Sequence, residues 1–110
     1  MIEHQALFTL LRTITYNDSP IPVAYDHFTS DKEVSIPFIV YRETSPDIFN
    51  ADGITYHQFL SYEIELITEK KEPALERQLE GLLTNNKIPY TKNDEVWDED
   101  EKIYHNFYEI

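Results

Sequence analysis

The chain contains no cysteine. It therefore has no disulfide, no cysteine-ligated zinc site and no thiol nucleophile. Its two glycines are too few for a glycine-rich phosphate-binding loop, and no G-x-S-x-G motif is present. No apolar run approaches the roughly 20 residues that span a bilayer, and no basic, then apolar leader follows Met1. These absences predict a water-soluble chain made in the cytoplasm.

Positive charge is scarce. Nine lysines and arginines stand against 21 aspartates and glutamates, which gives a formal net charge of −12. Phosphate backbones and anionic membranes repel such a chain, so we expect neither general nucleic-acid binding nor membrane binding. A basic protein partner, a metal ion or a negatively charged lumen suits this charge better.

The length of the chain and its hydrophobic and aromatic content indicate one folded domain. The sequence has 110 residues, of which 41% are hydrophobic and 14% aromatic, and eight of the aromatic residues are tyrosines. This length is sufficient for one hydrophobic core. Tyrosine buries its ring and keeps its hydroxyl in water, which suits half-buried sheet faces and protein interfaces. We expect a single domain over residues 1–110.

The stretch from Tyr56 to Leu83 organises the chain. Its first half alternates with period two, which predicts a long strand with one buried side. The buried side takes Tyr56, Leu60, Tyr62, Ile64 and Leu66, and the other takes Phe59, Ser61, Glu63 and Glu65. Its second half has helical periodicity. The helix buries Leu75, Leu79, Leu82 and Leu83 and leaves Glu76, Arg77 and Glu80 outside the apolar stripe.

The other elements follow from the same periodicities. The pattern predicts an amphipathic helix over 2–14, short strands over 21–26 and 36–43, and two further strands over 88–97 and 102–110. The resulting order is α-β-β-β-α-β-β. This order predicts an α+β fold in which two helices pack on a mostly antiparallel sheet of four to five strands.

No arrangement of residues predicts catalysis. The four histidines lie far apart without paired spacing, although His57 and His105 both fall on predicted strands and so can meet across a sheet. The acidic run 94–101 lacks the calcium-loop pattern and its turn glycine, which favours a solvated hairpin tip over a cation site. We expect neither an enzyme nor a bound cofactor or metal.

Two segments are candidate interfaces. The segment 44–54 carries Ile48 and Phe49 within a loop, where apolar side chains lower solubility unless a partner covers them. Trp97 ends a strand beside the acidic turn, where a core or rim position is favoured. Tryptophan is also enriched at interface hot spots, so an interface anchor is the alternative. The full set of predicted interface residues is Asp47, Ile48, Phe49, Asn50, Asp52, Phe59, Trp97, Asp98, Glu99 and Asp100. The outward pair Glu63 and Glu65 faces either water or a neighbouring subunit.

Several sequence segments, called phrases below, resemble those of a known protein family. They are the strand P-F-I-V-Y at 37–41, the acidic loop that follows it, Y-E-I-E-L-I-T-E-K-K-E-P at 62–73, Y-T-K at 90–92 and the ending I-Y-H-N-F-Y-E-I. Together with the length and element order, they resemble the small tail-completion or tail-terminator proteins of tailed bacteriophages and prophages. The resemblance covers nearly the whole chain.

The resemblance implies a fold similar to lambda-type tail terminators and a hexameric ring at the head-proximal end of the tail. Such a ring stops tube polymerisation and joins the tail to the head, so the implied partners are further copies, the tail tube protein and a head-completion or connector protein. It also implies a location in the virion after assembly in the host cytoplasm, and a subunit that is a monomer when alone. DNA would pass through the acidic ring without specific binding.

Two alternatives remain. A related small head–tail connector component is compatible with the same phrases. The charge of −12 alone is compatible with an acidic inhibitory protein that binds a basic enzyme or a nucleic-acid-binding protein.

Overall fold

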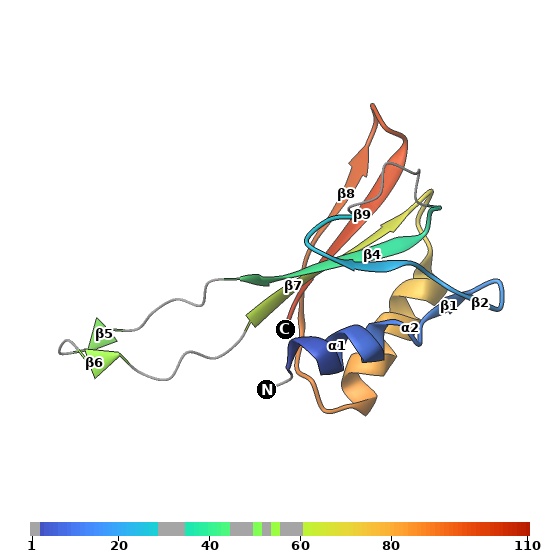
Figure 1. Cartoon of the computed structure of the whole chain (residues 1–110). Helices are drawn as coiled ribbons and strands as arrows, with labels where there is room; N and C mark the ends of the chain where they lie inside the picture. Colours follow the sequence, from blue (N-terminus) through green and yellow to red (C-terminus); the bar gives the residue numbers. More distant parts are fainter. Residues whose placement is uncertain (1–2, 29–34, 45–49, 52–53, 56–60) are drawn as a thin grey trace.

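Two helices lie on one side of a five-stranded sheet in the computed structural model (Figure 1). The structure describes residues 3–28, 35–44, 50–51, 54–55 and 61–110. The helices are α1 (His4–Leu11) and α2 (Pro73–Asn85). Neither of these described helices has the length and apolar character needed to cross a membrane.

The sheet is mixed and mostly antiparallel. Its spatial order is β3 (Val23–Tyr25), β4 (Phe38–Thr44), β7 (Ser61–Thr68), β9 (Ile103–Glu109) and β8 (Thr91–Asp98). Strands β3 and β4 run parallel, and every other neighbouring pair in this sheet is antiparallel. The predicted α+β fold, with two helices on a mostly antiparallel sheet, is confirmed.

Two short hairpins lie outside the five-stranded sheet. Strands β1 (Thr15–Tyr16) and β2 (Ser19–Pro20) pair across Asn17 and Asp18. Both turn residues have positive φ, at 51° and 64°, which asparagine and aspartate tolerate better than most residues. Strands β5 (Asn50–Ala51) and β6 (Ile54–Thr55) pair within the segment predicted as a loop.

The core forms between the helices and the inner face of the sheet, which is the face toward them. Alternate residues of β7 point inward, so the predicted period-two face is confirmed for 62–66, whereas 56–60 lie outside the described residues. Helices and strands together bury Leu7, Leu11, Ile39, Tyr41, Tyr62, Ile64, Leu66, Leu75, Leu79, Leu83 and Tyr108. This shared burial is the main stabilising interaction of the domain.

A proline and an asparagine mark the two ends of helix α2. Pro73 occupies the first turn, where its missing N–H is not needed. At the other end Asn86 caps the helix, and its side-chain amide donates to the Leu82 carbonyl at 2.8 Å. Lys87 then takes a positive φ of 58°, which turns the chain toward β8.

One prediction for α2 is wrong. Glu76 was expected outside the apolar stripe, yet it is only 3% exposed. Lys71 and Lys92 each direct an ammonium group to its Oε1 atom, at 2.8 and 2.5 Å. These two ion pairs compensate the buried charge, which periodicity alone does not reveal.

The helix–sheet contact can be tested at Leu79, which is fully buried. We expect Leu79→Ala to lower the free energy of unfolding by about 2 to 5 kcal/mol, because it leaves a cavity between α2 and the sheet. Thr84→Ala, on the exposed side of the same helix, should change it by less than about 0.5 kcal/mol. Urea unfolding followed by circular dichroism measures both. Equal effects would contradict the assignment of this core.

Candidate functional site

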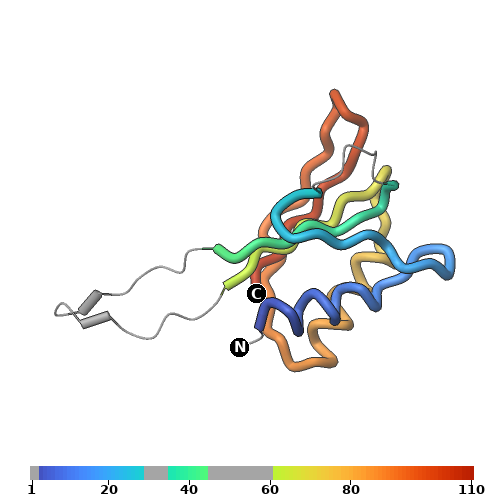
Figure 2. The backbone as a smooth tube through the Cα atoms, viewed as in Figure 1, coloured from blue at the N-terminus to red at the C-terminus, as the bar shows by residue number. Residues whose placement is uncertain are grey.

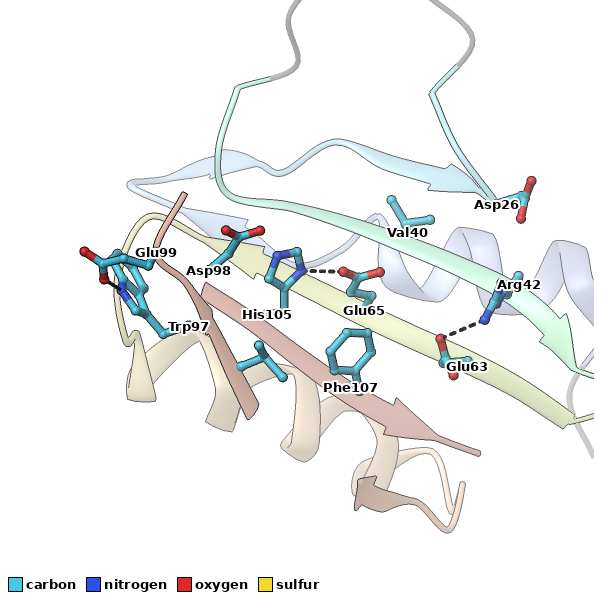
Figure 3. Close-up of a pocket in the computed structure, with 11 residues that line it drawn as sticks. Asp26, Val40, Arg42, Glu63, Glu65, Trp97, Asp98, Glu99, His105 and Phe107 are labelled. Carbon is cyan, nitrogen blue, oxygen red and sulfur yellow. Dashed lines mark hydrogen bonds and ion pairs between the residues drawn. The ribbon is translucent and has the colours of Figure 1, made fainter. Parts of the chain in front are cut away.

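The outer face of the sheet, which points away from α1 and α2, forms a hollow of about 560 Å³ (Figure 3). We call it the outer hollow. Its wall runs from Asp26, just after β3, across β4, β7 and β9 to residues 96–99 at the end of β8. Both edges of the sheet thus contribute to one concavity, as expected when a twisted sheet curls. No helix or strand among the described residues covers it.

Acidic side chains dominate the outer hollow. Five carboxylates line it, against one guanidinium and one imidazole, Arg42 and His105. The carboxylates belong to Asp26, Glu63, Glu65, Asp98 and Glu99. The local charge therefore has the same sign as that of the whole chain.

Cross-strand pairs hold the centre of the outer hollow in place. His105 Nδ1 lies 2.5 Å from Glu65 Oε1, between neighbouring strands β9 and β7. Arg42 contacts Glu63 at 3.4 Å, directly across the β4–β7 pair. Figure 3 shows both contacts, with the Phe107 ring beside them. The His105 and Phe107 rings are nearly parallel, with an angle of 7° between their planes.

The end of the β8–β9 hairpin closes one side of the outer hollow. Trp97 is 44% exposed, and its indole N–H donates to Glu99 Oε2 at 2.7 Å. Lys102 also contacts Glu99, at 2.8 Å. The hydrogen bonds from Lys102 and Trp97 lower the pKa of the Glu99 carboxyl. Asp98 accepts backbone hydrogen bonds from Asp100 and Glu101, which orders the acidic turn.

The structure thus brings together part of the predicted interface. Trp97, Asp98 and Glu99 line the outer hollow, together with Glu63 and Glu65 of the outward-facing pair. Asp100 is exposed in the adjacent turn, and Asn50 lies in β5. Asp47, Ile48, Phe49, Asp52 and Phe59 lie outside the described residues. The interface role of all these residues stays a prediction.

Sequence reasoning missed the apolar and cationic parts of the outer hollow. Val40, Val96, Phe107, Arg42 and His105 were not predicted as site residues. The signal for three of them is strand register: Arg42 lies opposite Glu63, and His105 lies opposite both Ile67 on β7 and Val96 on β8. Register across strands distant in sequence does not follow from periodicity within one strand.

A second charged cluster lies on the inner side, where α2 meets β8. Lys71 and Lys92 each contact both Glu76 and Glu95, and the Tyr104 hydroxyl donates to Glu95 at 2.8 Å. The hydrogen bonds from Lys71, Lys92 and Tyr104 lower the pKa of Glu95 from 4.5 to about 2. Every charge in this cluster has an opposite partner, so the cluster is a structural connection between α2 and the β8–β9 hairpin. We call its five residues, Lys71, Glu76, Lys92, Glu95 and Tyr104, the clasp.

The described residues offer no metal centre. In the described ranges, no three His, Asp or Glu side chains converge so that they could hold a metal ion. The pairing of His105 with Glu65 brings together one histidine and one carboxylate. His57, the predicted partner of His105 across the sheet, lies outside the described residues.

Comparison with known proteins gives no match to a protein-family model, a curated protein or a solved structure.

The clasp predicts how stability depends on pH. The pKa of Glu95 is lower in the folded state than in the unfolded state, so its contribution is complete above about pH 4.5 and is lost as the pH falls toward 2. We therefore expect Glu95→Gln to lower the urea midpoint at pH 7 and to have little effect near pH 2. Glu101→Gln, in the exposed turn, serves as the control at both pH values. A difference between Glu95→Gln and the parent that does not shrink on acidification would contradict the clasp.

Proposed function

We propose that this chain is a structural protein that works by binding other protein chains, as a tail-terminator subunit of a bacteriophage. In this role it closes the head-proximal end of the tail as a ring, stops tube polymerisation and presents a surface to the head connector. The phrases at 37–41, 62–73 and 103–110 that resemble tail-terminator proteins point to this class.

The observation that carries the proposal is the outer hollow. It is a concave face to which strands β4, β7, β9 and β8 contribute, and it mixes apolar side chains with charged ones at an exposed tryptophan. Protein interfaces combine these features: aromatic anchors, an apolar centre and a polar rim. A small-molecule site would be more enclosed and more apolar.

The sheet supports ring closure in a second way. A ring needs a heterologous contact, in which two different surfaces of one subunit meet across each interface. The described sheet ends in two unlike edge strands, β3 and β8. The bulge between Lys92 and Asp94 and the acids along β8 disfavour indiscriminate edge pairing.

The same charge that suits a DNA channel also supports a second candidate. An acidic inhibitor that binds a basic enzyme is favoured by the net charge of −12. It would form a compact complex with that enzyme, would not bind tail tubes, and would lose its partner at modest salt because exposed charges are screened beyond about 10 Å at 0.1 M.

The two candidates can be separated with purified tail tubes of a tailed phage that lack their terminator. We expect the chain to cap one tube end as a six-fold ring, visible by negative-stain electron microscopy. Trp97→Ser should reduce the fraction of capped tubes at least several-fold, because it removes an exposed aromatic anchor. Ile36→Ser is the matched control, because Ile36 is also exposed, at 40%, but lies outside the outer hollow. A chain that stays monomeric and leaves every tube end uncapped would refute the proposal.

A further inference from the structure

The carboxylates at the centre of the outer hollow have unused acceptor capacity. Arg42 and His105 contact Glu63 and Glu65 through the Oε1 atoms. A carboxylate accepts through two oxygens with about four lone-pair sites. The two glutamate side chains are 30% and 25% exposed. Their remaining lone pairs are therefore accessible to donors from another molecule.

Apolar side chains line the outer hollow together with these carboxylates. Val40 and Phe107 are half-buried, and Val96 and Trp97 are 40% and 44% exposed. Lysine and arginine have an apolar stem and a charged head, so they can place the stem on such a surface and the head on the carboxylates. An exposed tryptophan also attracts a cation to its ring face. The outer hollow therefore has the chemistry that recognises basic side chains.

Charge also selects among the candidate occupants. Five carboxylates surround one guanidinium and one imidazole. A second copy of the chain, with its own net charge of −12, would bring like charge to this surface. Nucleic acid would do the same. A basic protein segment is the occupant whose charge complements both the outer hollow and the whole chain.

We propose that the outer hollow binds a lysine- or arginine-bearing segment of a partner protein, with Glu63, Glu65 and Asp98 as the acceptors of its charged groups. The inference rests on the proposed function, because it assigns the chemistry of the partner that the assembly protein would meet. The partner's basic side chains lie over Val40 and Phe107, and Trp97 closes the site on the hairpin side. Strands β4, β7 and β9, which lie side by side (Figure 2), form the base of this site.

The probe is a fluorescent synthetic peptide that alternates lysine and leucine, with a peptide that alternates glutamate and leucine as its control. We expect anisotropy to show binding of the lysine peptide alone, with an affinity that falls as salt is added. The double variant Glu63→Gln/Glu65→Gln should weaken binding by about tenfold, since each partly exposed charge contributes modestly. Absence of lysine-peptide binding would refute the proposal.

A matched control separates the site from general attraction to an acidic chain. Asp18→Asn/Glu69→Gln removes the same two charges from exposed positions outside the outer hollow. It should change the affinity by less than about twofold. Equal weakening by the two double variants would overturn the assignment to this face. So would amide NMR signals of 38–44, 61–68 and 103–109 that shift with protein concentration and not with the peptide, because a second copy would then be the occupant.

The tube-capping assay distinguishes failure of this inference from failure of the proposed function. If rings form on tail tubes but the lysine peptide does not bind, the site assignment is wrong and the ring proposal stands. If the peptide binds through Glu63 and Glu65 but no tube is capped, the site stands and the tail-terminator assignment is wrong.

Discussion

One-sided burial of the five-stranded sheet is the constraint on which the rest of the structure depends. Both described helices pack on the inner face, where Tyr62, Ile64 and Leu66 of β7 meet Leu79 and its neighbours on α2. Two layers are the minimum that can bury an apolar sheet face. The described part of the chain forms two layers only, so it leaves the second face of the sheet without a covering layer. The outer hollow is therefore a direct consequence of how the core is built.

Because the chain is acidic, electrostatic free energy opposes folding most where α2 packs against the β8–β9 hairpin. We call this contact the join. Glu76 is buried in the middle of this join, and a buried unpaired carboxylate would destabilise the domain strongly. Lys71 and Lys92 are two of only nine basic residues in the chain, and both are directed at Glu76 and Glu95. These two lysines thus compensate the carboxylate that is buried, whereas carboxylates outnumber cationic groups in the outer hollow.

Sequence periodicity predicted the structural features that depend only on residues within one helix or strand. The inward face of β7, the leucine stripe of α2 and the α+β class follow from periods of two and 3.6. The burial of Glu76 does not follow, because it depends on Lys92, which is distant in sequence and reaches the helix from β8. The same holds for the outer hollow: the sequence drew attention to Glu63, Glu65, Asp98 and Glu99, but the concavity that they line depends on which strands are neighbours. Topology, not composition, brings Asp26 and Glu99 to the same surface.

The charge of the chain connects the two proposals. Repulsion between copies that each carry −12 opposes ring closure, and at physiological ionic strength charges within about 8 Å of the contact contribute most. A basic segment bound in the outer hollow neutralises carboxylates on the subunit before the copies meet. Because binding free energies are linked, association of the copies in turn tightens the binding of the segment. Under the two proposals, this coupling would make the subunit a monomer when alone and a ring on its partner.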